Sequence, residues 1–334
     1  MPVVVRPVAA QPVVIAEPTT ITVTSTLSSG PDSIRSAIEK ANLSKVPVRI
    51  VFALKSGTRV YVFRQLPSIR GYGTEVVGNG VILKGGDCMR SGDREGCDGL
   101  VIVASGVVVR GLASDGFLLD GFSVRGQARD VIIADCKARG NRDDGIGVSE
   151  RAQAVTIENC TLEGNGFRTK GKGVLVFDNS DAVLKGNTIK GNRDGVAVTR
   201  GSSVLLIANT VAENYDKGVG VTGSRLTGYD NVIIKNGLGK AGQPAPPNAD
   251  GLRVSYDSTV ELANTTIEGN GDKGVVVSGS STVVLRGGSI SGNGGQGAVV
   301  RDSAVLDLRG VAVGKNGGEF LTEGRGRLIR RNTP

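Results

Sequence analysis

The chain has 334 residues, of which 51 are glycine, 12 are aromatic (7 Phe and 5 Tyr) and none is tryptophan or histidine. Glycine this frequent argues against a helical bundle, and a hydrophobic fraction of 39% argues against disorder. Without histidine, Ser-His-Asp catalysis, His-ligated zinc and imidazole acid–base chemistry are excluded. Any catalysis must use carboxylates, lysine, arginine, tyrosine, serine or a metal held by oxygen ligands.

The net charge of +8 suits either a solvated surface or attraction to a polyanion such as an acidic polysaccharide. Nucleic-acid binding is not expected, because aromatic residues are few and short basic clusters occur only at Arg325, Arg327, Arg330 and Arg331. No apolar run approaches the ~20 residues of a membrane span. Residues 1–18 lack the charged-then-apolar pattern of a signal peptide.

The N-terminal part is predicted to precede the main fold. Residues 1–20 read as an extended, Pro-rich segment, and residues 21–48 as a cap that contains one short helix. The helix is indicated by apolar residues at the i, i+3, i+4, i+7 spacing, Ile34, Ala37, Ile38 and Ala41. Asp32 or Ser33 would be its N-cap. We expect this helix to cover the first coil of the fold that follows.

An internal repeat of about 23 residues occupies most of the chain. Its first column is a glycine followed by apolar-x-apolar, at Gly99, Gly121, Gly145, Gly173, Gly195, Gly218, Gly251, Gly274 and Gly297. A second column is Asn141, Asn165, Asn192, Asn214, Asn236, Asn270, Asn293 and Asn316, and a third is Ser180, Ser202, Ser224, Ser258, Ser281 and Ser303. Short alternating strands with Gly, Asn and Ser turns predict one coil of a parallel β-solenoid per repeat.

The predicted fold is therefore all-β, a single-stranded right-handed parallel β-helix of about ten coils with a short N-terminal capping helix. We place the β-helix at residues 49–317 and a C-terminal cap with a basic tail at residues 318–334. Phe320 and Leu321 would close that end. Stacked asparagine amides are expected to bond to one another along the axis.

The four cysteines form two candidate pairs. Cys88 and Cys97 bracket a polar excursion that a disulfide would pin. Cys136 and Cys160 occupy the same column on adjacent coils, where they either pair or form a buried apolar stack. An even count with one plausible loop disulfide favours an oxidising compartment.

The column that precedes each repeat glycine carries the candidate chemistry: Asp98, Asp120, Asp144, Lys172, Asp194, Lys217, Asp250, Lys273 and Gln296. From Asp144 onward Asp and Lys alternate, which predicts a ladder of salt bridges between coils. The alternation fails where Asp120, Asp143 and Asp144 crowd one edge without a lysine between them. Unpaired carboxylates repel unless one is protonated or a cation binds. An oxygen-ligand site for Ca²⁺ would resolve this crowding.

The segment Gly30-Pro-Asp-Ser-Ile-Arg-Ser-Ala-Ile-Glu-Lys-Ala-Asn42, with Ile50-Val-Phe52 and Leu66-Pro-Ser-Ile69, resembles the N-terminal cap of secreted bacterial β-helix proteins. The resemblance is to the superfamily of pectate lyases and polygalacturonases, and covers about residues 50–316. It implies a secreted, cell-surface or periplasmic protein. Since the superfamily holds lyases, hydrolases, epimerases and adhesins, it implies no single activity.

The resemblance to the lyases of this superfamily implies that the protein is a Ca²⁺-dependent enzyme, which cleaves an acidic polysaccharide by β-elimination. Asp120, Asp143 and Asp144 would then hold Ca²⁺. Lys172 would be the base, and the cations of Arg168 and Lys170 would lower its pKa.

Two alternatives remain. Asn141-Arg-Asp-Asp-Gly-Ile-Gly-Val148 resembles the paired-Asp motif of polygalacturonases, in which Asp143 and Asp144 would act as acid and base. However, Gly171-Lys172-Gly173 stands where that family has Gly-His-Gly, and its Arg-Ile-Lys segment is missing. The second alternative is a non-catalytic scaffold or adhesin.

The adhesin alternative, with self-association, rests on outward strand positions that are mostly small and apolar: Val101, Ser123, Gly147, Leu175, Ala197, Gly220, Arg253, Val276 and Val299. Against a bare scaffold, the two long insertions, residues 166–172 and 237–250, enlarge the same turn and would wall a cleft. Tolerated variation in loop length is the other explanation.

Overall fold

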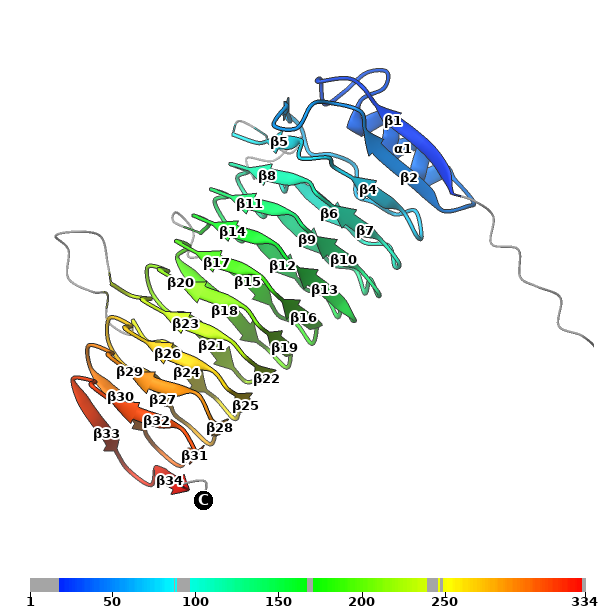
Figure 1. Cartoon of the computed structure of the whole chain (residues 1–334). Coiled ribbons are helices and arrows are strands. Elements are labelled where there is room, and N and C mark those ends of the chain that lie inside the picture. Colours follow the sequence, from blue (N-terminus) through cyan, green and yellow to red (C-terminus); the bar gives the residue numbers. More distant parts are fainter. Residues whose placement is uncertain are drawn as a thin grey trace, which may run out of the picture.

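The computed structural model describes residues 18–86, 88, 97–166, 171–238, 246 and 249–331. Arg168 and Lys170, the residues before 18 and most of the 237–250 insertion lie outside this range. The described chain is a solenoid of about eleven turns, elongated along its axis, with one short helix at the N-terminal end (Figure 1). The all-β fold class and the capping helix are confirmed.

In the described chain the solenoid has three parallel sheets, of 13, 11 and 10 strands, and each coil from β6 to β32 contributes one strand to each sheet. The first sheet contains, in order, β1 (Thr19–Val23), β2 (Val48–Phe52), β4 (Glu75–Val77), β7 (Val108–Arg110), β10 (Ile132–Ala134), β13 (Val155–Glu158), β16 (Asp181–Lys185), β19 (Ser203–Ile207), β22 (Arg225–Tyr229), β25 (Thr259–Ala263), β28 (Thr282–Arg286), β31 (Val305–Arg309) and β34 (Arg327–Arg331). The second contains β3 (Arg59–Tyr61), β5 (Ile82–Lys84), β8 (Ala113–Asp115), β11 (Lys137–Arg139), β14 (Thr161–Glu163), β17 (Thr188–Lys190), β20 (Thr210–Ala212), β23 (Val232–Ile234), β26 (Thr266–Glu268), β29 (Ser289–Ser291) and β32 (Ala312–Gly314).

The third sheet carries the glycine column at the start of its strands. It contains β6 (Leu100–Ile102), β9 (Phe122–Val124), β12 (Ile146–Val148), β15 (Lys172–Val176), β18 (Asp194–Thr199), β21 (Val219–Thr222), β24 (Leu252–Ser255), β27 (Val275–Val277), β30 (Gln296–Val300) and β33 (Gly318–Thr322). Strands pair in register from coil to coil, so residues at equal positions of the repeat stack into columns.

Helix α1 (Ile34–Leu43) caps the first coil, as the apolar spacing predicts. Ser33 is the N-cap, and its hydroxyl accepts a hydrogen bond from the backbone N–H of Ser36 at 3.3 Å. The four residues of the predicted apolar face are buried. The helix thus closes the hydrophobic interior, which consists mainly of valine, isoleucine and leucine side chains.

Asparagine side chains form the predicted ladder along the axis. The Nδ2 group of each residue of the column donates to the Oδ1 atom of the next, from Asn141 to Asn316. Each described amide also satisfies backbone groups of the turns that it joins. A second, shorter ladder of Asn187, Asn209 and Asn231 was not predicted from the sequence. These ladders fix the register in which the column before the repeat glycines stacks.

The cysteines divide as the sequence suggests. Cys88 and Cys97 form a disulfide, so this predicted pair is confirmed. Cys136 and Cys160 are unbonded thiols in the core, which selects the buried stack over the disulfide. The hydrogen bond with Cys136 and burial raise the pKa of the Cys160 thiol, so the neutral form is held.

The predicted apolar strip on the third sheet needs correction. Six of its nine positions are themselves buried: Val101, Ser123, Gly147, Ala197, Val276 and Val299. These buried positions therefore add little exposed apolar surface for self-association. The sheets also continue past residue 317, because β33 pairs with β30 and β34 pairs with β31.

Among the described residues, no helix combines the length and apolarity needed to cross a bilayer.

Candidate functional site

The aspartates that precede the repeat glycines have a shared backbone role. The Oδ1 atom of Asp98 accepts the backbone N–H of Asp120 at 3.2 Å, and Oδ1 of Asp120 accepts that of Asp144 at 3.1 Å. Oδ1 of Asp144 in turn accepts the N–H of Lys172. Each carboxylate therefore links its own coil to the next one, and this bond holds the side chain along the outer edge of the third sheet.

Asp120, Asp143 and Asp144 come together as an acidic triad. One carboxylate oxygen from each lies within 4.8 Å of the other two. Asp144 is 4% exposed, and the other two are partly buried. They come from two consecutive turns, those before β9 and β12. The sequence-predicted juxtaposition is thus present in the structure.

A glycine makes room for this triad. A Cβ atom at Gly147 would lie 2.5 Å from Oδ2 of Asp120, closer than such contacts occur. The Asp120 carboxyl therefore leans over β12 and occupies the space that a side chain would fill. Gly147 appears in the sequence only as one more small residue of the outward strip, so its role was not predicted. A strand glycine commonly marks a close approach of this kind.

The electrostatics of the triad are unfavourable in the absence of a cation. Burial, then the charges of Asp144, Asp98 and Asp143, raise the pKa of Asp120 well above its usual value. Burial and then the charge of Asp143 raise the pKa of Asp144 to about 7. The N–H and the ammonium of Lys172 offset part of this rise in Asp144. The site therefore retains protons near neutrality unless a cation replaces them.

The flanking column positions are compensated by cations. On the N-terminal side, a guanidinium nitrogen of Arg125 lies 3.6 Å from Oδ2 of Asp98. On the other side, Nζ of Lys172 lies 3.4 Å from Oδ2 of Asp194, and Nζ of Lys217 lies 3.5 Å from its Oδ1. The predicted alternation of charges is therefore present in this stretch. Arg125 was not predicted, because it lies on no repeated column.

Further along, the predicted ladder is wrong in its side-chain partners. Lys273 forms its ion pair with Asp272, its sequence neighbour, at 2.5 Å. Asp250 is instead held by Arg253, whose Nε lies 2.7 Å from Oδ2. Only the backbone N–H of Lys273 reaches Asp250, at 3.3 Å. A lysine side chain is long and flexible enough to pair with whichever carboxylate lies nearest, whereas the backbone hydrogen bond between coils is fixed by the coil geometry.

Three carboxylates that offer only oxygen donors are the kind of donor set that Ca²⁺ prefers. The residues present fit this ion: Asp120, Asp143 and Asp144 would supply ligands, with no nitrogen or sulfur donor among them. Lys172 stands on the next coil, with its side chain about one-fifth exposed. The two predicted helper cations, Arg168 and Lys170, lie outside the described residues.

The fold and this outer edge define a solenoid with a polar site on its third sheet. The family described as the right-handed β-helix region matches residues 53–183, 95–243 and 172–333. The chain belongs to this family, which also confirms the predicted handedness. No curated protein matches the chain in sequence.

Several solved structures share the fold. The alginate lyase from Paenibacillus sp. str. FPU-7 has a TM-score of 0.60 at 14% identity, covering 93% of this chain and 99% of that one. The A-module of the Azotobacter vinelandii mannuronan C-5 epimerase AlgE6 has a TM-score of 0.57 at 17% identity, covering 94% and 99%. The periplasmic alginate epimerase AlgG gives 0.54 at 14% identity, covering 86% and 70%. At these identities the likeness shows the fold alone.

Proposed function

We propose that this protein is a Ca²⁺-dependent polysaccharide lyase, which cleaves an acidic, uronate-containing polysaccharide by β-elimination. The observation that carries the proposal is the acidic triad, three carboxylates with oxygens within 4.8 Å of one another, with Lys172 on the next coil. Support for an acidic substrate comes from the structural neighbours described as alginate epimerases and alginate lyase. The disulfide and the periplasmic location of AlgG support action outside the cytoplasm.

In this mechanism Asp120, Asp143 and Asp144 would hold Ca²⁺. The bound ion would neutralise the substrate carboxylate and acidify the proton on the adjacent carbon. The Nζ atom of Lys172, as the neutral amine, takes that proton. The electron pair forms a carbon–carbon double bond, the C–O bond to the leaving sugar breaks, and the leaving oxygen takes a proton from water.

The test uses the ultraviolet absorbance of the unsaturated uronate product, on alginate and pectate, with Ca²⁺ or EDTA. We expect activity with Ca²⁺ and none with EDTA. Lys172→Met should lose at least about a hundredfold in rate, as for removal of a general base. Lys217→Met is the matched control, since Lys217 stands in the same column and pairs with the same Asp194. Equal losses in the two variants, or no product on either polymer, would contradict the proposal.

A glycoside hydrolase is the second candidate, favoured by one observation. The pKa of Asp144, raised to about 7, keeps this carboxyl protonated as a general acid requires, beside the partly exposed Asp143. Their oxygen separation of at most 4.8 Å is closer to that of retaining than of inverting enzymes. A structural neighbour described as a GH87 α-1,3-glucanase from Streptomyces thermodiastaticus shares the fold at 14% identity and a TM-score of 0.58. New reducing ends without ultraviolet absorbance, formed in EDTA, would select this reaction over elimination.

A further inference from the structure

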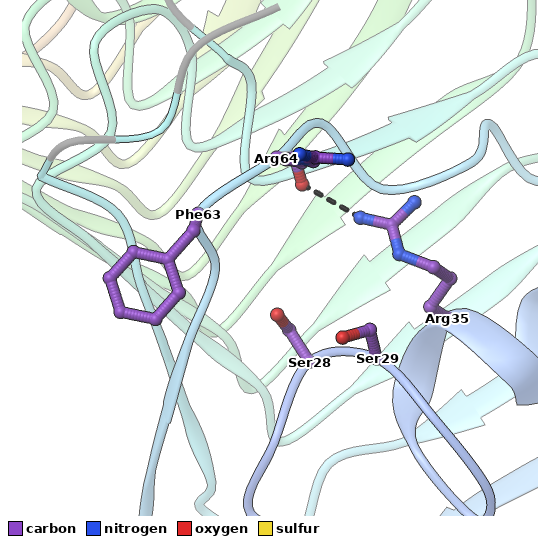
Figure 2. Close-up of a pocket in the computed structure, with 5 residues that line it drawn as sticks. All are labelled: Ser28, Ser29, Arg35, Phe63 and Arg64. Atoms are coloured by element: carbon purple, nitrogen blue, oxygen red, sulfur yellow. Dashed lines mark hydrogen bonds between the residues drawn. The ribbon is translucent and has the colours of Figure 1, made fainter. Parts of the chain in front are cut away.

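A cavity of about 380 Å³ lies at the N-terminal end of the solenoid, between the capping segment and the first coil (Figure 2). It is lined by Ser28, Ser29, Arg35, Phe63 and Arg64, and we call it the cap pocket. Figure 2 shows the Phe63 ring and the Arg35 side chain on opposite sides of the space, with the two serine hydroxyls at its base. Its volume is at the lower end for ligand sites and suits about one or two sugar rings.

One polar side chain of the pocket, that of Ser28, has a hydroxyl that is available to a ligand. Ser28 is 8% exposed, and within the described residues its hydroxyl makes no hydrogen bond. In Figure 2 this hydroxyl points into the cavity. Because the hydroxyl faces the open cavity, it can bond to water when the pocket is empty and to a ligand when the pocket is filled.

The charge of the pocket indicates an anion. Arg35 and Arg64 line it, and none of the described residues that line it carries a carboxylate. Two guanidinium nitrogens of Arg35 donate to the backbone carbonyls of Gln65 and Arg64, at 3.0 and 2.9 Å, so this side chain is held in place. Two bonds leave three of its five N–H donors for a ligand. Among the described residues, neither arginine forms an ion pair, so their charges are available to a carboxylate.

Exposed aromatic rings add a stacking surface beside these charges. Phe63 is 63% exposed and Tyr61 is 47% exposed, in a chain that has few aromatic residues. Their rings stack on each other, with centroids 6.4 Å apart and planes inclined by 14°. Large exposed rings of this kind mark interaction sites. A flat apolar ring next to guanidinium and hydroxyl groups matches the two faces of a carboxylated sugar.

The cap pocket also lies on the same edge as the acidic triad. Ile69 pairs with Ile102 one coil later, which places Gln65 in the column position of Asp98. The Gln65 amide exchanges hydrogen bonds with the backbone of Asp98, at 2.9 and 3.2 Å. Arg64, directly before Gln65, therefore stands where Asp143 stands three coils later. Three coil spacings are roughly 14 Å, a span that a short oligosaccharide bridges.

We propose that the cap pocket is a second binding site for a carboxylated sugar, and that it holds a distal residue of the polysaccharide that crosses the triad. This proposal rests on the proposed function for the identity of the polymer. Arg35 and Arg64 bind the carboxylate, Phe63 stacks on the ring, and Ser28 bonds to a sugar hydroxyl. The site adds affinity for long chains and takes no part in bond cleavage.

Calorimetric binding of mannuronate hexasaccharide and disaccharide, in EDTA, tests this site without any need for turnover. Arg64→Gln and Phe63→Ala should each weaken hexasaccharide binding at least about tenfold. Arg70→Gln and Tyr72→Ala are matched controls, since both side chains are exposed and lie outside the pocket, and should leave binding unchanged. Circular dichroism spectra and melting temperatures would show that all variants are folded.

A smaller change gives a second readout. Ser28→Ala removes only the unpartnered hydroxyl, so it should weaken binding while leaving stability equal or higher. Wild-type affinity in Arg64→Gln and Phe63→Ala would overturn the proposal, as would equal binding of a neutral hexasaccharide of glucose. Binding that these variants abolish, in a protein without lyase activity, would leave the cap pocket standing and reject the proposed function instead. Lyase activity whose dependence on chain length is the same in the variants as in the wild type would support the proposed function and reject the cap pocket.

Discussion

The acidic triad predicts that, without a divalent cation, the protein loses stability as the pH rises towards neutrality. Burial and the neighbouring Asp143 raise the pKa of Asp144 from 3.8 to about 7. The folded chain therefore keeps a proton that the unfolded chain has lost between about pH 4 and pH 7. Since the folded state binds more protons in this window, the free energy of unfolding falls as the pH rises through it. The stability that this retained proton contributes is complete below about pH 4 and is lost above about pH 7.

The gap between 3.8 and about 7 corresponds to about 4 kcal/mol. Asp144→Asn removes the charge and keeps an oxygen that can accept the N–H of Lys172. In EDTA near pH 8 this variant should be more stable than the wild type, by up to about 4 kcal/mol. Near pH 4 the two proteins should converge, because Asp144 is then neutral in the folded wild type.

Urea unfolding followed by circular dichroism, at pH values from about 4 to 8, measures this difference. Asp194→Asn is the matched control in the same column: Asp194 pairs with Lys172 and Lys217, so its removal should destabilise the protein at neutral pH. Ca²⁺ at a hundred times its dissociation constant should add about 2.7 kcal/mol to the wild type and less to Asp144→Asn. A wild type as stable at pH 8 as at pH 5 in EDTA, with no gain in Asp144→Asn, would refute the reasoning.

Three further predictions concern packing. Gly147→Ala should displace the Asp120 carboxyl and lower the calcium-induced rise in melting temperature. Gly220→Ala should leave that rise unchanged, because a Cβ atom at Gly220 would have its nearest neighbour at 3.7 Å. Equal responses of the two variants would contradict the close-approach argument. Asn214→Ala interrupts the ladder and should cost at least about 1–3 kcal/mol in urea unfolding, because buried partners are left unpaired; a neutral effect would show that water replaces the amide. Iodoacetamide should label Cys136 and Cys160 only after unfolding, because both thiols are buried and the pKa of the Cys160 thiol is raised. Rapid labelling of the native protein would contradict this prediction.

The fold could be predicted from the sequence because a solenoid repeats its local rules. Each coil places glycine, asparagine and apolar residues at the same positions, so independent columns agree on one register. The capping helix followed from four apolar residues and the Ser33 N-cap. The second asparagine ladder was missed because it spans only three coils, too few for the column to stand out.

Side-chain partners were predicted less well, because columns fix where a backbone lies and not which way a long side chain turns. Asp144 and Lys172 lie where the column places them, whereas Lys273 turns to Asp272. Arg125 joins the acidic edge from a different part of the coil. The cap pocket could not be predicted either, since it forms between two segments that follow no repeat.

The position of the triad within the column is itself an argument about function. A β-helix that needed only stability would continue the pairing seen at Asp194, where two lysines compensate one carboxylate. Instead, three carboxylates crowd together at the coils of β9 and β12, and Gly147 leaves space for one of them to lean across the sheet. The result is a local cost in stability that a bound cation would remove. Arg125 pairs with the coil before the cluster and two lysines pair with Asp194 on the coil after Lys172, so the crowded carboxylates stand where Lys172 adjoins them. This is where a lyase would need both its metal and its base.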